Sequence, residues 1–427
     1  MTIDTEITRV EAIRVWDSRG RPTIEAIVHL AGGSKGRAIA PAGASTGSNE
    51  AVDLRDGGTP FGGYDVQGAL AGINGEISTT LRGYNAVDQS GIDQILINLD
   101  GTDKKERLGG NATIAVSMAV VQASANAYQL PLWRYLGGDD TSHLYLPEIQ
   151  IFGGGAHADR RIDIQDFMVV AVGAESYVQA LEWTAEVYIT AGKIMAERGL
   201  LMGLADEGGY WPAFENNSEG LDFLVMAIER AGFIPGEHMA IALDIAASEF
   251  GTNGRYRLAL ENRNLDSDGM CAMMVDWVER YPICSLEDPL GEDDREGMKK
   301  LTDAIGHNVQ IVGDDYLTTS ATRVNEAATE HICNSVLIKP NQAGTITEAK
   351  AAYDASLSAG WTAIISGRSG ETEDATICHL AVAWGVPQLK VGSFARSERM
   401  IKWNEGLRIA HEIGNQGELI PRSTFPW

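Results

Sequence analysis

The sequence predicts an α/β protein in which an eight-stranded α/β barrel follows a smaller α+β domain. Three observations lead to this prediction. From residue 235 onward, six short apolar runs each end near a polar residue, and these polar residues follow one another at intervals of 24 to 43 residues. Such an interval accommodates a strand, a helix and two loops. Continuous apolar strands that alternate with helices indicate a parallel sheet covered on both faces.

The first part of the 427-residue chain has a different pattern. Residues 9–18 and 23–30 alternate between apolar and polar side chains on either side of the turn-like SRGRP, which predicts a hairpin. Helical patterns follow at residues 66–81 and 111–129, with Asn111 as the expected N-cap of the second helix. These elements predict a small α+β domain.

The boundary between the two domains is expected in the polar, turn-rich segment that contains GGDDTSH. We therefore expect an N-terminal α+β domain over residues 1–137 and a barrel domain over residues 138–427. Residues 167–172 and 200–205 are expected to add two strands, which brings the barrel to eight. A doubly wound open sheet is the alternative arrangement. Barrel helices are expected at residues 292–305, 345–358 and 373–384.

Composition excludes several classes of protein. The chain has 34 Lys and Arg against 59 Asp and Glu, and this formal net charge of −25 argues against a nucleic acid as partner. With 44% hydrophobic and 22% charged residues, the chain is expected to be globular and not disordered. The same charge favours solubility and divalent cations, but it is unfavourable for a small anionic substrate.

Targeting signals and disulfides are not expected. The first residues lack the basic and apolar regions of a signal peptide, and the uncharged stretch at residues 108–133 is too polar for a membrane helix. Four widely separated cysteines without a CxxC motif are typical of reduced thiols in a cytosolic protein. We therefore expect a cytoplasmic protein.

Three carboxylates, Asp244, Glu287 and Asp314, stand at the ends of three successive apolar runs. In α/β barrels the chemistry lies at the carboxyl ends of the strands, so these side chains are expected to converge. One such carboxylate alone would be more simply explained by a salt bridge or a loop cap. Three together repel one another unless a cation binds them, and hard oxygen ligands without His or Cys suit Mg²⁺ and not Zn²⁺.

Two of the next three apolar runs carry lysines, Lys339 and Lys390, and SGRSGETED lies between these two runs. A lysine near a metal can have a lowered pKa and act as a base, although it could equally be a counter-ion of the acids. The guanidinium group of Arg368 can bind a phosphate or a carboxylate. Earlier carboxylates in DIQDF and LADEGG could supply the acid that a lysine base needs on the opposite face of a substrate.

These motifs resemble those of enolase, the Mg²⁺-dependent enzyme that dehydrates 2-phosphoglycerate to phosphoenolpyruvate. The resemblance extends along nearly the whole chain and includes DSRGRPTIEA, GASTGSNEAVDLRDG, GGAHADRRIDIQDFM, DEGGYWP, SLEDPLGEDD, LIKPNQAGTITEA, SGRSGETED and RSERMIKWNEGLRI. It implies an enolase-type modified (β/α)8 barrel that opens with a ββαα unit, behind the smaller N-terminal α+β domain. It also implies a homodimer or an octamer built from dimers.

The resemblance further implies roles for individual residues. Asp244, Glu287 and Asp314 would bind one Mg²⁺, and Ser45 of the GASTG loop would bind a second. Among the catalytic residues, Lys339 would be the base and Glu207 the acid, with Asp166 and His157 beside them. Substrate-binding roles fall to Lys390, Arg368, Ser369, Gln165, Gly367 and Ala44.

Three positions depart from the enolase pattern. Asp166 stands where enolases have Glu, Gly367 where they have His, and Gly153 where they have Asn. The shorter side chain of Asp166 would withdraw its carboxylate by roughly 1 Å, a displacement that can cost on the order of 100-fold in rate. Gly367 is expected to leave space beside Arg368. Metal binding and proton abstraction are thus expected to be intact, while acid assistance and the phosphate surroundings are altered.

The expected function is that of a Mg²⁺-dependent enolase-family lyase. It would remove a proton alpha to a carboxylate and eliminate water from 2-phosphoglycerate or from a related, bulkier phosphorus-containing glycerate. A specific alternative is an enzyme that resembles the carboxyphosphonoenolpyruvate synthases of phosphonate biosynthesis. A further alternative is a non-catalytic homologue with a structural or binding role.

Overall fold

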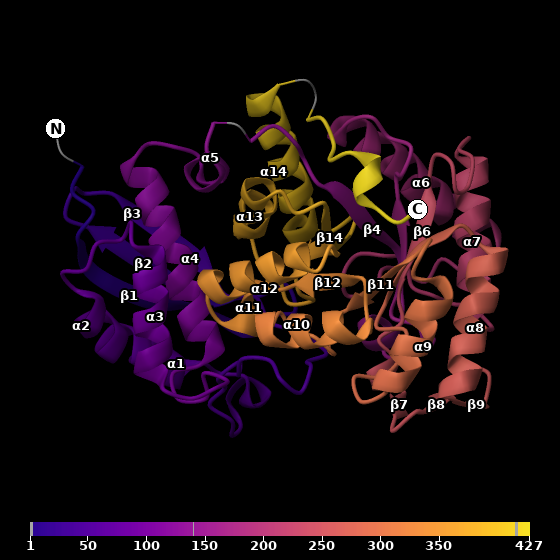
Figure 1. Cartoon of the computed structure of the whole chain (residues 1–427), viewed down its shortest axis with the longest axis horizontal. Coiled ribbons are helices and arrows are strands. Elements are labelled where there is room, and N and C mark those ends of the chain that lie inside the picture. The colour runs from indigo at the N-terminus through magenta and orange to yellow at the C-terminus, as the bar shows by residue number, and fades with distance from the viewer. Residues whose placement is uncertain (1–2, 140, 415–416) are drawn as a thin grey trace.

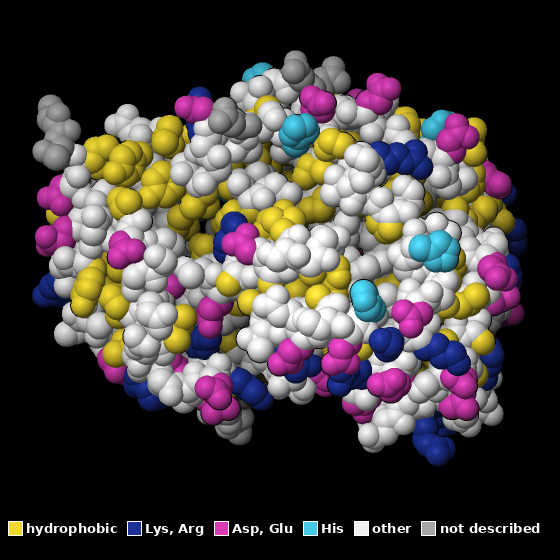
Figure 2. Space-filling model, viewed as in Figure 1, with side chains coloured by type: hydrophobic (Ala, Val, Ile, Leu, Met, Phe, Trp, Pro, Cys, Tyr) yellow, Lys and Arg dark blue, Asp and Glu magenta, His cyan; other side chains and the backbone are white. Residues whose placement is uncertain are grey.

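The computed structural model describes residues 3–139, 141–414 and 417–427 (Figure 1). The N-terminal domain lies at one end of the molecule and a closed barrel of eight strands at the other. Figure 2 shows acidic and basic side chains interspersed over the same face of the molecule. The four cysteines are free and buried, as expected of reduced thiols.

Three antiparallel strands form the sheet of the N-terminal domain, in the order β1 (Ile7–Trp16), β2 (Pro22–Leu30) and β3 (Lys35–Ile39). Strands β1 and β2 form the predicted hairpin, in which Trp16 pairs with Pro22. The helical elements of this domain are η1 (Pro60–Gly63), α1 (Gln67–Gly72), the π-helical turn η2 (Ile73–Ile77), α2 (Ser78–Leu81), α3 (Gln89–Asp100), α4 (Gly110–Ala127) and α5 (Leu132–Gly137).

Helix α4 is the uncharged segment of the sequence, and it packs against β2 and β3 with most of its residues buried. Asn111 is not its N-cap, because the helix begins at Gly110 and Asn111 lies inside the first turn. The amide of Asn111 instead binds the N–H and C=O groups of Leu54 (3.2 and 3.1 Å), which ties the preceding loop to α4. In the described ranges, no helix is long and apolar enough to cross a membrane.

Eight strands close the barrel, in the order β4 (Leu146–Gly153), β5 (Asp166–Val170), β6 (Ala240–Asp244), β10 (Ile283–Glu287), β11 (Gln310–Gly313), β12 (Ser335–Ile338), β13 (Thr362–Ser366) and β14 (Gln388–Ser393). Strand β5 is antiparallel to both of its neighbours, and the other pairs are parallel. The barrel therefore opens with two strands before its first helices, as expected of the modified type. A small sheet outside it consists of β7 (Gly251–Thr252), β8 (Arg255–Leu258) and β9 (Arg263–Asp266).

One predicted barrel strand was wrong. Residues 200–205 form only an isolated bridge between Leu204 and Tyr210, and Leu201 and Met202 are exposed. The eighth strand is β4 instead. Its polar residues Glu148 and Gln150 interrupt the apolar run from which a buried strand is recognised.

The helices around the barrel alternate with its strands and cover them (Figure 1). The predicted helices are α9, α12 and α13, and each begins later than expected because polar residues precede it, such as the N-cap Thr345 of α12. The bounds are α6 (Tyr177–Glu197), α7 (Asn217–Arg230), α8 (Ser267–Arg280), α9 (Arg295–Ile305), α10 (Ala321–Glu330), α11 (Pro340–Ala343), α12 (Ile346–Ser358), α13 (Thr376–Trp384) and α14 (Ser397–Ile413). Short 3-10 turns are η3 (Gly155–Ala158), η4 (Ala247–Glu249) and η5 (Arg422–Thr424).

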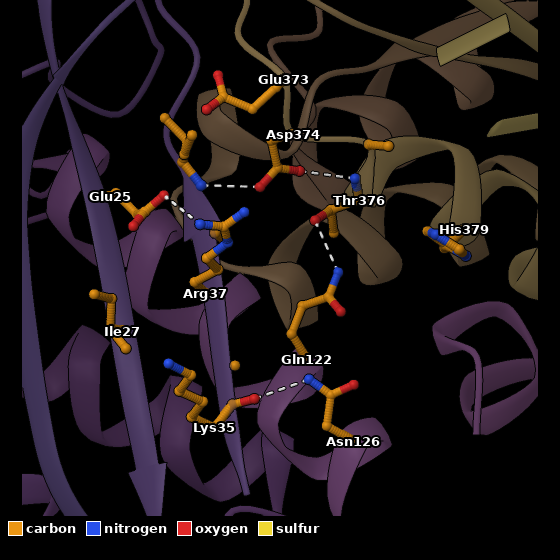
Figure 3. Close-up of a pocket in the computed structure, with 14 residues that line it drawn as sticks. Glu25, Ile27, Lys35, Arg37, Gln122, Asn126, Glu373, Asp374, Thr376 and His379 are labelled. Carbon is orange, nitrogen blue, oxygen red and sulfur yellow. Dashed lines mark hydrogen bonds and ion pairs between the residues drawn. The ribbon is translucent and has the colours of Figure 1, made fainter. Parts of the chain in front are cut away.

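Partly buried hydrogen bonds join the two domains. The carboxylate of Asp93 on α3 accepts from both the N–H (3.0 Å) and the hydroxyl (2.6 Å) of Thr347 on α12. On the other side of α4, Asp374 accepts from the N–H of Ile39 on β3 (2.9 Å), beside a cavity of about 450 Å³ between the domains (Figure 3). These contacts hold the N-terminal domain, and with it the loop that follows β3, against the barrel.

A polar layer lies inside the barrel toward the amino ends of its strands. Gln310 donates hydrogen bonds to Thr362 and Gln388 (2.7 Å each), and Gln388 donates to the buried carboxyl group of Glu148 (3.3 Å). Burial raises the pKa of Glu148 from its ordinary value of 4.5 to about 7, although the charge of Lys390 acts against this shift. This buried carboxyl group takes the place of the branched apolar residues that usually fill a barrel.

Replacement of Glu148 by glutamine is expected to change how stability depends on pH. Because the folded pKa of Glu148 is raised, its contribution is fully present below pH 4.5 and is lost as the pH rises through 7. At pH 8, Glu148→Gln should therefore be more stable than the wild type by on the order of 3 kcal/mol, and below pH 4.5 the two should be equal. Urea unfolding at pH 4 and pH 8 measures the difference. The exposed Glu182→Gln serves as the control, and an equal response of both variants would contradict the assignment.

Candidate active site

A narrow cavity opens at the carboxyl ends of the barrel strands, under the loop of the N-terminal domain that follows β3. Twelve of the fourteen predicted site residues line it: Ala44, Ser45, His157, Gln165, Asp166, Glu207, Asp244, Lys339, Gly367, Arg368, Ser369 and Lys390. The other two, Glu287 and Asp314, lie next to it and contact its lysines. The structure thus brings together residues that are spread over more than 300 positions of the sequence.

The barrel register brings the acidic strand ends together. Asp166 on β5 pairs with Asp244 on β6, and Asp244 pairs in turn with Glu287 on β10. The ammonium group of Lys390 on β14 contacts all three carboxylates, at 2.9 Å from Asp244, 2.7 Å from Glu287 and 3.3 Å from Asp166. Burial alone would lower the pKa of Lys390, but these acids outweigh it and raise the pKa well above the ordinary value.

Lys339 follows β12 and forms an ion pair with Asp314, which follows β11. Gln342 holds the other oxygen of Asp314 (2.9 Å) and is itself held by Thr319 (2.7 Å). Burial lowers the pKa of Lys339, but Asp314 outweighs burial, and the pKa is raised. This direction differs from the lowered pKa that the sequence leads one to expect of a base, because Asp314 is a direct partner of the lysine.

His157 lies between the carboxyl groups of Asp166 and Glu207, on the side of the cavity opposite Lys339. Its Nε2 atom is 3.7 Å from Asp166 Oδ1 and 3.8 Å from Glu207 Oε1. Burial raises the pKa of Asp166. Burial also acts to raise the pKa of Glu207, but the charges of His157 and Arg399 outweigh it and lower the pKa. The pKa values of these two neighbouring carboxyl groups are therefore shifted in opposite directions.

Arg368 follows β13 and is held from three sides. Its guanidinium group donates to Glu50 (2.9 and 3.2 Å), to Asn341 (3.2 Å) and to the backbone carbonyl of Ser45 (3.0 Å). Since Ser45 and Glu50 belong to the GASTG loop, this arginine connects the loop of the N-terminal domain to the barrel. The position of the loop is thereby coupled to the position of the Arg368 guanidinium group, which lines the cavity.

Gly367 does not open the free space that the sequence suggests. A Cβ atom at this position would lie 3.0 Å from Glu371 Oε1 and 3.3 Å from Val391 Cγ1, both closer than ordinary contact. Glu371 is fixed there, because it accepts from the N–H of Arg368 (2.9 Å) and forms an ion pair with the buried Lys402 (2.7 Å). A larger side chain would require this pair to shift.

Several polar atoms at the site have no hydrogen-bond partner within the described part of the chain: Ser369 Oγ, Gln165 Oε1, His157 Nδ1 and Glu287 Oε1. These atoms are free to bind a ligand, although unpartnered buried atoms also occur elsewhere among the described residues, such as Tyr145 Oη and Ser335 Oγ. Two clusters of buried side chains have ligand atoms close enough for a metal ion, His157–Asp166–Glu207 and Asp288–Asp314–Asp315. Among the described residues, the predicted ligands Asp244, Glu287 and Asp314 do not form such a cluster; Asp314 belongs to the second cluster, and the lysines Lys339 and Lys390 contact all three acids. As oxygen donors without His or Cys, the three acids have the chemistry that Mg²⁺ prefers.

The sequence analysis missed the supporting residues. Glu50, Gln342, Glu371, Arg399 and Lys402 hold the residues above, yet no role was assigned to them. Their sequence signal is weak, because a buried partner is distinguished from a surface charge only by what lies next to it in space. The only signal was that all five residues fall inside the enolase-like motifs.

The fold and the site are typical of an α/β-barrel enzyme, in which a cavity at the carboxyl ends of the strands is lined by buried lysines, an arginine and carboxylates. Family models match almost the whole chain: "Enolase, N-terminal domain" over residues 7–136 and "Enolase, C-terminal TIM barrel domain" over residues 141–425. The chain is 45% identical over 423 residues to Enolase 2 of Pseudomonas syringae pv. syringae, covering 99% of each chain. It is 46% identical over 423 residues to Enolase 1 of Desulfitobacterium hafniense, covering 98% of this chain and 97% of the relative. The chain therefore belongs to the enolase family, and it is a carbon–oxygen lyase of that family.

Removal of the central cation is expected to destabilise the fold strongly. In Lys390→Met, three buried carboxylates lose their shared partner, and breaking a buried ion pair from one side costs roughly 3–5 kcal/mol. The loss of unfolding free energy should be largest at pH 8 and smaller at pH 5, because the carboxylates can then take up protons. Urea unfolding in the presence of a chelator measures it. The exposed Lys35→Met is the control, and a loss below about 1 kcal/mol would show that the carboxylates do not depend on Lys390.

Proposed function

We propose that the enzyme removes the proton alpha to the carboxylate of 2-phosphoglycerate and eliminates water, in a Mg²⁺-dependent reaction. One observation carries this proposal. In the closed order of strands, β12 and β5 are diametrically opposite, so Lys339 faces the group of Asp166, His157 and Glu207 across a single cavity. Elimination of water requires a base and an acid on opposite sides of the reacting carbons.

Each residue has a distinct task in this reaction. Lys339 takes the proton from carbon 2, which requires that it first lose its own proton. Glu207, whose lowered pKa means that it must first take up a proton, supplies that proton to the departing hydroxyl group on carbon 3, with Asp166 and His157 as its support. Lys390 neutralises the substrate carboxylate.

The remaining predicted residues bind the phosphate and close the site. Arg368 and Ser369 hold the phosphate, with Gly367 beside them, and Ala44, Ser45 and Gln165 complete the wall of the cavity. The unpartnered Ser369 Oγ and Gln165 Oε1 support these binding roles, because a bound ligand would satisfy them. The GASTG loop would close over the substrate and exclude water.

We assign the metal sites to the same cavity. Asp244, Glu287 and Asp314 would hold one Mg²⁺, and Ser45 would contribute to a second. Bound Mg²⁺ would stabilise the negative charge that develops on the substrate carboxylate when the proton leaves. The lysines that now neutralise these acids would have to give up part of these contacts to the metal ions.

A second candidate is a reaction of the same type on a larger phosphorus-containing glycerate, as in the carboxyphosphonoenolpyruvate synthases. Only Gly367 favours it, because no side chain at this position covers the cavity. The comparisons with known proteins do not support it, and Glu371 restricts the space next to Gly367. Elimination of water from 2-phosphoglycerate is therefore the better-supported proposal.

Three further expectations belong to this proposal. The assembly would be a homodimer or an octamer of dimers, and exposed apolar side chains on the N-terminal domain, such as Trp16 and Phe61, which pack together, are consistent with a covered surface. A domain boundary between residues 137 and 138 would coincide with the end of α5. The free, buried cysteines are compatible with the cytoplasm.

The purified enzyme is expected to turn over 2-phosphoglycerate at roughly tens per second when Mg²⁺ is present, and not in a chelator. Lys339→Met should reduce kcat by roughly 10²–10⁴-fold because it removes the base. Absorbance of the enol product measures the rate. The exposed Lys193→Met on α6 should retain full activity. A wild type that binds Mg²⁺ but leaves 2-phosphoglycerate unchanged would overturn the proposal.

Gly367→Ala distinguishes the two candidate substrates. If 2-phosphoglycerate is the substrate, the wild type should prefer it to a glycerate ester with a carboxyl group on phosphorus, and alanine should change kcat/KM for the two esters equally. If the larger ester is the substrate, the preference is reversed, and the added methyl group should reduce its kcat/KM about 10-fold more than that of 2-phosphoglycerate. Competition between the two esters measures the ratio. Gly75→Ala is the control for glycine substitution, because Gly75 does not line the cavity, has no positive φ and has open space for a methyl group.

A further inference from the structure

Gln150 on β4 has no exposed surface and connects two parts of the active site. Its Nε2 atom donates a hydrogen bond to Asp166 Oδ1, and its Oε1 atom accepts one from the N–H of Gly209 (2.8 Å). The partners determine the orientation of the amide, because the N–H of Gly209 can only donate. The side chain therefore makes two directed contacts, one to a site carboxylate and one to the backbone.

Two glycines provide the space that Gln150 occupies. A Cβ atom at residue 153 would lie 3.1 Å from Gln150 Oε1 and 2.8 Å from the Cβ of Ala205, and a Cβ at residue 209 would also collide with the amide oxygen. An asparagine at position 153, as in the enolase pattern, would therefore compete with the amide of Gln150 for the same space. The position of the Gln150 amide therefore depends on the absence of a side chain at Gly153.

The second contact reaches the proposed acid. Gly209 lies two residues after Glu207, and the turn between them is closed by hydrogen bonds between the backbones of Ala205 and Gly209 (2.7 Å) and of Gly208 and Ala205 (3.1 Å). By holding the N–H of Gly209, Gln150 holds this turn against β4. One neutral side chain thus connects Asp166 with the segment that carries Glu207.

We infer that Gln150 is a positioning residue that sets the place of the Asp166 carboxylate relative to Glu207. The amide of Gln150 reaches Asp166 from β4 and makes up for the methylene by which this aspartate is shorter than the glutamate of the enolase pattern. The effect of this positioning on catalysis rests on the proposed function, in which Asp166 supports the acid Glu207. A displacement of about 1 Å in such a group can cost on the order of 100-fold in rate.

Exchange of one methylene between the two side chains tests the inference. Gln150→Asn shortens the amide, Asp166→Glu lengthens the carboxylate, and the double variant restores the combined length. Each single variant should reduce kcat by about 100-fold and change KM by less than about 3-fold, while the double variant should return to within about 10-fold of the wild type. A double variant no better than the worse single variant would overturn the inference.

A control separates positioning from stability. Gln310 is another buried glutamine in the barrel, with two hydrogen bonds and no contact with the site cavity. Gln310→Asn should lower Tm and leave kcat within about 3-fold of the wild type. If Gln150→Asn likewise lowers Tm alone and leaves kcat intact, its role is structural and the inference fails.

A second measurement does not depend on the substrate. The ring signals of His157, which is 3.7 Å from Asp166, report where the carboxylate lies, and they can be assigned by NMR with His157→Gln. They should shift in both single variants and return toward the wild-type position in the double variant. If the wild type fails to turn over 2-phosphoglycerate, the proposed function fails, and the His157 signals still decide the inference. Ring signals that do not return in the double variant contradict it.

Discussion

The carboxylates buried at the mouth of the barrel are the constraint on which the rest of the structure depends. Asp166, Asp244, Glu287 and Asp314 are each at most 6% exposed, and like charges so close together cannot remain ionised without cations. Lys390 meets three of them and Lys339 meets the fourth. Because each of these six residues comes from a different strand or strand end, the barrel must close in one register for the charges to cancel.

The charged residues that surround the site are also buried in pairs of opposite charge. Arg368 is paired with Glu50, and Lys402 with Glu371, and all four side chains are buried. The first pair joins the GASTG loop to the barrel, so the N-terminal domain contributes to the site and does not merely lie against it. The formal charge of −25 therefore says little about the cavity, since most acids lie on a surface where both signs are interspersed (Figure 2).

Two of the three departures from the enolase pattern, Asp166 and Gly153, both lie next to the amide of Gln150. Asp166 is shorter than the usual glutamate, and Gly153 lacks the usual side chain, and the amide of Gln150 lies between these two positions. Gly367 is independent of them, because its surroundings are set by Glu371 and Val391. A position that departs from a family pattern is thus interpretable only with its neighbours in space.

Much of the fold could be predicted, because a buried parallel strand is a continuous apolar run and the chemistry of a barrel lies where such a run ends. Strand β4 could not, since Glu148 and Gln150 interrupt its apolar run and are tolerated only through partners on other elements. The raised pKa of Lys339 was equally beyond prediction, because it depends on direct contact with Asp314.

By itself, the sequence determined the family, the order of the barrel elements after residue 235 and the set of charged groups that stand at the strand ends. Only the tertiary structure decided which charge meets which, that Gln150 connects Asp166 with the turn of Glu207, and how little room surrounds Gly367. The physical reason is range: strand and helix patterns depend on neighbours in the chain, whereas the energy of a buried charge or amide depends on partners a few ångströms away in space that are distant in sequence.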